Sequence, residues 1–310
     1  ESFMKYHFYS DFDCIVKIDG TIVKVIAGTK TIAQTSDELD VVEVVPLNRY
    51  ELLPYCFSLG DTLNGVQENL VDLIKVNSGN TIIKLGCNYP KIYSTLTSLS
   101  TLSADYEVVC DGGIKLNCGQ KLIAEKHFDC TSAELYQKNN LIFCTLTGHT
   151  CKLLLVLDEQ NNIIIDDCIT QIEHLTNGFQ TLKSLDDMQK QGIVKKYEIG
   201  DSGVQKTGEY AVYINHSAKE IYSQKFVPLA FFEAVQASNT SLAKTYLTGT
   251  LSSSITPAHL KAYFGDFDQI YDVSDINNFP SVCLYSSKTH TQSVCKISML
   301  ANKIDNVEKI

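Results

Sequence analysis

The sequence has few of the residues by which many functions are recognised. Tryptophan is absent, and Arg49 is the only arginine among 26 basic residues. A single guanidinium excludes the paired, bidentate arginine clamps that often hold phosphate or carboxylate groups. The preference for lysine is typical of AT-rich codon usage, so we expect a low-GC bacterial source.

Positive charge and long apolar runs are also scarce. The formal net charge is −10, which argues against nucleic-acid partners and against anionic membrane surfaces. No stretch approaches the ~18 apolar residues that a membrane-spanning helix needs. The segment that follows Met4 lacks the apolar region of a secretory signal. The sequence therefore predicts a cytoplasmic protein that contacts neither nucleic acid nor membrane.

The 11 cysteines do not form a recognisable disulfide or metal pattern. Their number is odd, none belongs to a C-x-x-C pair, and most lie in apolar runs such as "LIFCTL". Cysteine in such runs behaves as a small buried hydrophobic residue. We therefore expect reduced, structural thiols.

The sequence contains no complete motif for binding a metal or a phosphate or for a catalytic nucleophile. The acidic run from Asp266 to Asp275 lacks the glycine and the final glutamate of a calcium loop. No H-E-x-x-H or G-x-S-x-G is present, and "GDSGVQKTG" from Gly200 departs from the P-loop pattern. His216 and Glu220, four residues apart, suit a solvated pair better than a ligand pair. We predict no metal, no cofactor and no catalytic residue.

The stretch "CIVKIDGTIVKV" contains the Asp-Gly-Thr that follows the nucleophile of dehalogenase-type phosphatases. With Asp19 as the second acid, the nucleophile position would be Lys17, which cannot attack phosphorus. Asp-Gly between two alternating apolar runs instead predicts a tight hairpin, because both residues tolerate positive φ. We interpret Asp19 and Gly20 as a turn.

Residues 4–205 predict a β-rich region of one or two domains. Apolar runs recur every 8–12 residues with Gly, Asn and Asp between them, which is typical of an antiparallel sandwich or barrel. One short helix is expected at residues 181–191, where Leu182, Leu185 and Met188 are three residues apart.

Residues 210–310 predict a small α+β domain. "KFVPLAFFEAVQASNTSLAKTYLT" suggests two helices, the second capped by Thr240. "TPAHLKAYFG" suggests a third, with Thr256 as cap, Pro257 at the first position and Gly265 at the end. Alternating strand-like segments complete the chain. The overall expectation is an α+β fold.

The order "FFEAVQASNTSLAKTYLTG", "LKAYFGDF" and strands ending in "ANKIDNVEKI" resembles the cone-shaped fold of nuclear-transport-factor-like proteins. The resemblance covers about the last 90 residues and rests on element order. It implies a helical hairpin that closes a curved sheet around a pocket. That family includes enzymes with Asp/His pairs and members without catalysis, and no catalytic motif of the family is matched.

Three functions are consistent with these features. The first is a non-catalytic binding or assembly module that takes a protein partner or self-associates through sheet edges. The second is a pocket in the C-terminal domain that binds a small molecule or performs acid–base catalysis. The third is carbohydrate binding by tyrosines of the N-terminal sheets. Candidate pocket residues are Tyr263, Phe264, Asp266, Tyr285 and His290.

Overall fold

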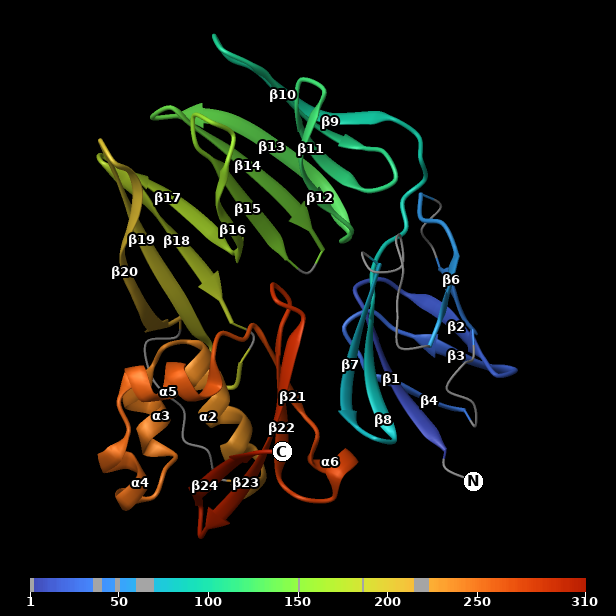
Figure 1. Ribbon diagram of the computed structural model, residues 1–310, viewed down its shortest axis with the longest axis vertical. Coiled ribbons are helices and arrows are strands. Elements are labelled where there is room, and N and C mark those ends of the chain that lie inside the picture. The colour runs from blue at the N-terminus through green and yellow to red at the C-terminus, as the bar shows by residue number, and fades with distance from the viewer. Residues whose placement is uncertain are drawn as a thin grey trace. The chain divides into compact units, whose positions relative to one another are not determined.

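The computed structural model describes residues 3–35, 41–47, 51–59, 70–149, 151–185, 187–214 and 223–310. Its contacts divide the chain into two compact units, Glu1–Ile169 (unit 1) and Thr170–Ile310 (unit 2). Figure 1 shows unit 1 in blue to green and unit 2 in yellow to red. The domains expected at residues 4–205 and 210–310 stay a prediction. His216 and Glu220 lie outside the described residues.

The described residues of unit 1 form four four-stranded sheets, and their strand pairs are antiparallel except for the parallel pair β1–β8. Two sheets have the orders β4-β1-β8-β7 and β3-β2-β5-β6. Their strands are β1 (Met4–Ser10), β2 (Cys14–Ile18), β3 (Thr21–Val25), β4 (Thr31–Thr35), β5 (Val41–Pro46), β6 (Tyr55–Ser58), β7 (Val71–Asn77) and β8 (Asn80–Leu85).

The other two sheets of unit 1 are meanders in which strands adjacent in sequence are neighbours in the sheet. The first contains β9 (Ser94–Ser100), β10 (Asp105–Cys110), β11 (Ile114–Cys118) and β12 (Lys121–Lys126). The second contains β13 (Cys130–Lys138), β14 (Leu141–Gly148), β15 (Lys152–Leu157) and β16 (Ile163–Ile169).

The turn expected at Asp19 and Gly20 is confirmed. β2 and β3 pair antiparallel, with Ile18 opposite Thr21. Asp19 has φ 47° and Gly20 φ 69°, the positive values that a two-residue type I′ turn requires. Lys17 pairs across the hairpin with Ile22 and forms an ion pair with Glu43 at 3.5 Å. The stretch is therefore structural.

Unit 2 contains two more meanders with helices between them. The first has β17 (Gln171–Leu175), β18 (Gly178–Ser184), β19 (Gln191–Gly200) and β20 (Gly203–Tyr213). The second has β21 (Gln269–Asp272), β22 (Ser281–Ser286), β23 (Thr291–Leu300) and β24 (Lys303–Lys309). The helices are η1 (Gln224–Phe226), α2 (Val227–Gln236), α3 (Thr240–Thr245), α4 (Gly249–Ser254), α5 (Pro257–Phe264) and α6 (Ser274–Asn277).

Helix ends follow local side-chain chemistry, with one difference from expectation. Thr256 caps α5 by accepting a hydrogen bond from the His259 amide at 3.2 Å, and Gly265 ends the helix with φ 71°. The cap of α3 is Asn239, which accepts from the Leu242 amide at 3.2 Å. The prediction of Thr240 is therefore wrong by one residue. Both side chains can cap, and only the backbone direction chooses between them.

The helix expected at residues 181–191 is also wrong. Thr181 and Leu182 belong to β18, where Leu182 pairs with Val194 of β19. Met188 then lies in the connection and Gln191 begins β19. Three apolar residues at spacing three are too few to specify a helix when an antiparallel partner strand follows at once. Tertiary pairing overrides the weak local preference.

The expected α+β fold with a cone-shaped second domain is wrong, because the described residues are β-rich, with 57% in strands and 14% in helices. The helices are short, and α2, α3 and α5 share one core with β22, β23 and β24. Figure 1 shows them grouped beside this sheet. The resemblance to the cone-shaped fold was based on this short helical segment, which lies in the chain between two four-stranded sheets. No helix among the described residues is long and apolar enough to cross a membrane.

Candidate functional site

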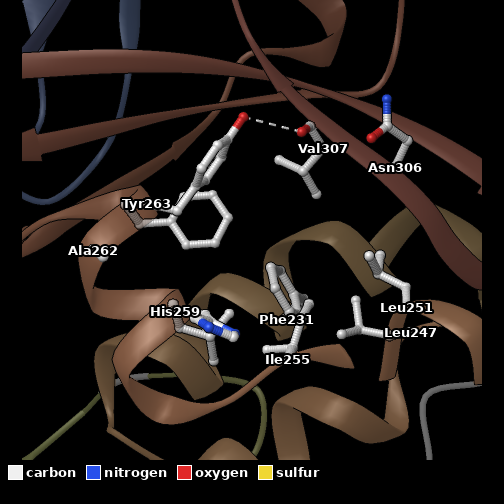
Figure 2. A pocket seen from close by; sticks show the side chains of 11 residues that line it. Phe231, Leu247, Leu251, Ile255, His259, Ala262, Tyr263, Asn306 and Val307 are labelled. Carbon is white, nitrogen blue, oxygen red and sulfur yellow. Dashed lines mark hydrogen bonds between the residues drawn. The ribbon is translucent and has the colours of Figure 1, made fainter. Parts of the chain in front are cut away.

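Unit 2 contains a pocket of about 450 Å³ between its helices and the last strand. Figure 2 shows side chains from α2, α4, α5 and β24 around it. It is lined by Phe231, Leu247, Leu251, Ile255, His259, Leu260, Ala262, Tyr263, Phe264, Asn306 and Val307.

Aromatic side chains form the inner wall. Phe231 is 1% exposed and lies edge-on to Phe264, with ring centroids 6.1 Å apart. Phe264 also makes edge contacts with Phe232 at 5.1 Å and with Tyr263 at 5.0 Å. Edge-to-face packing is the favoured arrangement for such rings, so these contacts stabilise the wall. The pocket therefore has a preformed apolar surface.

The connection between α3 and α4 is fixed to β24 by backbone hydrogen bonds. Leu247 forms an isolated bridge with Ile304. The Ile304 amide donates to the Tyr246 carbonyl at 2.8 Å, and the Thr248 amide donates to the Ile304 carbonyl at 2.9 Å. These bonds hold Leu247 and, one turn later, Leu251 against the pocket. The sheet thus positions a wall made by helices.

The polar lining residues lie at the rim. Tyr263 is 45% exposed, and its hydroxyl donates to the Val307 carbonyl at 3.2 Å, the dashed line in Figure 2. The Lys309 ammonium lies 5.0 Å from the centre of the Tyr263 ring. His259 and Asn306 are exposed and lie on opposite sides of the apolar lining in Figure 2.

The lining chemistry suits binding better than acid–base chemistry. Among the described residues that line the pocket, none is Asp, Glu, Lys or Arg. In the part of the chain that the structure describes, His259 has hydrogen bonds to Thr256 and Ser254 and none to a carboxylate that would orient it as a base. Apolar walls with a few polar groups at the edge are typical of small-molecule sites.

Two of the five residues proposed from the sequence line the pocket, namely Tyr263 and Phe264. Asp266 follows α5 but is not a lining residue. Its side chain is 88% exposed and lies 3.8 Å from the Lys261 ammonium. An ion pair this exposed contributes little to stability.

Tyr285 and His290 are close to each other but do not line the pocket. Tyr285 is 2% exposed in β22, and its hydroxyl lies 3.1 Å from Nδ1 of His290. The Tyr285 carbonyl also accepts a hydrogen bond from the Asp268 amide at 3.0 Å. These contacts secure the end of the β22–β23 hairpin. A ligand role for either side chain stays a prediction.

Pocket residues that the sequence analysis missed are mostly ordinary apolar residues on short helices. Phe231, Leu247 and Leu251 carry no signal that separates a pocket wall from a closed core. His259 stands two residues after the Thr256-Pro257 start of a helix, which marked the helix but not the site. The pocket arises from the packing of elements, which a single sequence does not record.

A polar pair in unit 1 joins two connections rather than forming a comparable site. Asp129, which is 4% exposed, lies 2.7 Å from Nδ1 of His149 in the β14–β15 turn. Gly148 permits this approach, because a Cβ there would lie 2.7 Å from the Asp129 carbonyl oxygen. No group of three or more His, Cys, Asp or Glu in the described part of the chain could hold a metal ion.

Comparison with known protein families finds no family model that matches the chain. Comparison with curated proteins finds no match either.

Proposed function

We propose that unit 2 is a non-catalytic binding module that takes a small, chiefly apolar molecule into the pocket beside α5 and β24. The observation that carries this proposal is the apolar lining of a cavity of about 450 Å³. This volume is within the ~300–1,000 Å³ usual for ligand pockets. A cytoplasmic location is part of the proposal and is supported by the thiol state of the cysteines.

The driving force is the removal of apolar surface from water, about 25 cal/mol for each Å². Part of it offsets the lost freedom of the ligand. For ~15 non-hydrogen atoms at ~0.4 kcal/mol each, the binding free energy is about 6 kcal/mol, which corresponds to a Kd of tens of micromolar. A protein partner and carbohydrate binding stay predictions.

The test is a titration with N-phenylnaphthylamine, a neutral apolar probe whose fluorescence rises in apolar surroundings. Leu251→Trp fills the pocket and should weaken probe binding at least tenfold. Leu300→Trp is the matched control, because Leu300 is 62% exposed on β23 and is not a lining residue.

Ile255→Trp is the second variant in case Leu251→Trp unfolds, and circular dichroism checks both. Saturable binding by the natural chain that survives Leu300→Trp and is lost in the pocket variants supports the proposal. The absence of saturable binding, or equal binding by the pocket variants and the control, would overturn it.

A further inference from the structure

A backbone contact of the lining residue His259 determines which of its two ring nitrogens carries the hydrogen. Its Nδ1 lies 3.2 Å from the carbonyl oxygen of Ser254, the last residue of α4. A carbonyl oxygen can only accept, so Nδ1 must carry the hydrogen. In the neutral imidazole, the other nitrogen, Nε2, is then an acceptor.

The described residues leave this acceptor unused. The hydrogen bonds of His259 are those of its amide with Thr256 and of its Nδ1 with Ser254. Figure 2 shows the His259 ring on the side of the pocket where Ile255 lies. An acceptor at the edge of an apolar cavity favours a ligand that brings its own donor.

The other two polar lining residues do not select for a donor in the same way. The Tyr263 hydroxyl already donates to the Val307 carbonyl, so only its oxygen lone pairs remain. A phenolic oxygen is a much weaker acceptor than an imidazole nitrogen, because its lone pair is delocalised into the ring. Asn306 carries both a donor and an acceptor on its amide, so it accepts either kind of partner. Nε2 of His259 is therefore the strongest acceptor that the polar lining residues offer to a ligand.

Resting on the proposed function, we infer that the pocket takes a neutral apolar molecule with a hydroxyl group, and that this hydroxyl donates to Nε2 of His259. A carboxylate would present only acceptors to the Nε2 lone pair. It would also have to lose water, and the described lining contains neither Lys nor Arg to pair with it, since Lys309 lies over the Tyr263 ring outside the lining. A plain hydrocarbon would bring no donor to Nε2.

The experiment compares four ten-carbon ligands in competition with the probe at a single, mildly alkaline pH. Decanol has the donor, decyl methyl ether keeps the oxygen without the donor, decanoate is charged, and decane is apolar. We expect decanol to bind about three- to tenfold more tightly than the ether, the range for one neutral hydrogen bond. Decanoate should bind more weakly than decanol.

Variants assign the preference to one side chain. His259→Phe keeps a ring of similar shape without nitrogen, and the ratio of ether to decanol Kd should fall to about one. His259→Gln retains an acceptor and should keep part of the ratio. Asn306→Leu, at the opposite side of the rim, tests whether the other polar side chain carries the preference. Leu300→Trp, which lies outside the pocket lining, is the control and should keep the whole ratio.

The outcomes separate this inference from the proposed function. Equal binding of decanol and ether, tighter binding of decanoate, or a preference that disappears in Asn306→Leu but not in His259→Phe would overturn the inference while the pocket still binds. Failure of the probe and of all four ligands would overturn the proposed function as well.

Discussion

A buried polar network connects the β18–β19 loop to the helices of unit 2. Gln191 is fully buried, and its side-chain nitrogen donates to Asp187 Oδ2 at 2.9 Å. Its backbone amide donates to the other oxygen of Asp187 at 2.8 Å. Its side-chain oxygen accepts from Asn239 at 3.0 Å, and Asn239 caps α3. One amide side chain thus satisfies a buried carboxylate and a helix cap at once.

We expect Gln191→Leu to destabilise unit 2 by about 2–4 kcal/mol. The substitution preserves volume but removes a partner from Asp187 and one from Asn239, and each buried polar group left unsatisfied costs ~1–3 kcal/mol. Urea unfolding followed by circular dichroism measures the change. Gln171→Leu, on the exposed side of β17, is the control and should shift stability by less than ~0.5 kcal/mol. Equal effects of the two variants would contradict the role of the network.

Single residues were predictable where their own chemistry determines the backbone. Asp19-Gly20 and Thr256-Pro257 are examples, since positive φ, capping oxygens and a fixed proline φ are local properties. The choice between Asn239 and Thr240 as the cap of α3 was not predictable, because both side chains can cap a helix. Phe231 could be assigned to an apolar helix face, but not to a pocket, for which distant elements must be placed.

The glycines of two hairpins should respond differently to alanine, because the two sites place different demands on them. Gly20 needs φ 69°, but nothing lies within 4 Å of a Cβ there. Gly178 opens β18 with ordinary φ, but a Cβ would collide with the backbone oxygen of Tyr197 in β19. We expect Gly20→Ala to cost about 1–2 kcal/mol through backbone strain. Gly178→Ala should cost at least as much through displacement of β18 from β19.

Hydrogen exchange locates the effect, because loss of a strand pair exposes amides of that hairpin alone. Protection should fall across β18 and β19 in Gly178→Ala, and only near the turn in Gly20→Ala. Gly249→Ala is the control, since its added Cβ meets nothing within 4 Å and its φ is not positive. Unchanged protection of β18 and β19 in Gly178→Ala would show that the strands tolerate the added carbon.

Strands were predictable as elements because period-two alternation and turn residues both identify them. The pairs β7–β8, β10–β11 and β19–β20 join at the Asn, Asp and Gly runs visible in the sequence. The helix expected at residues 181–191 failed because three apolar positions fit either element. The parallel pair β1–β8 was not predictable, since about 70 residues separate its strands and no local signal records the pairing.

At the scale of the whole chain, both units bury thiols in their cores. Cys14 and Cys144 belong to the core of unit 1, and Cys295 to that of unit 2, with Cys283 fully buried in the adjacent strand. Burial raises the pKa of Cys14 and Cys295 to about 11, and that of Cys144 and Cys283 to about 12. The cause is the loss of water around the thiolate, since the thiol itself is compatible with an apolar core.

These shifts predict a loss of stability at alkaline pH. In the unfolded chain a cysteine ionises near pH 9.0, whereas Cys144 keeps its proton to about pH 12 when folded. Above pH 9.0 the folded state therefore binds more protons, and the free energy of unfolding falls as pH rises, by up to about 1.4 kcal/mol per pH unit for each buried thiol. Below pH 9.0 this contribution is fully present.

Urea unfolding between pH 8 and 11 measures the slope, and Cys144→Ala should make it shallower. Val156→Ala, an equally buried truncation in β15, should lower stability without changing the slope. The same slope in Cys144→Ala as in the natural chain would show that this thiol does not carry the effect.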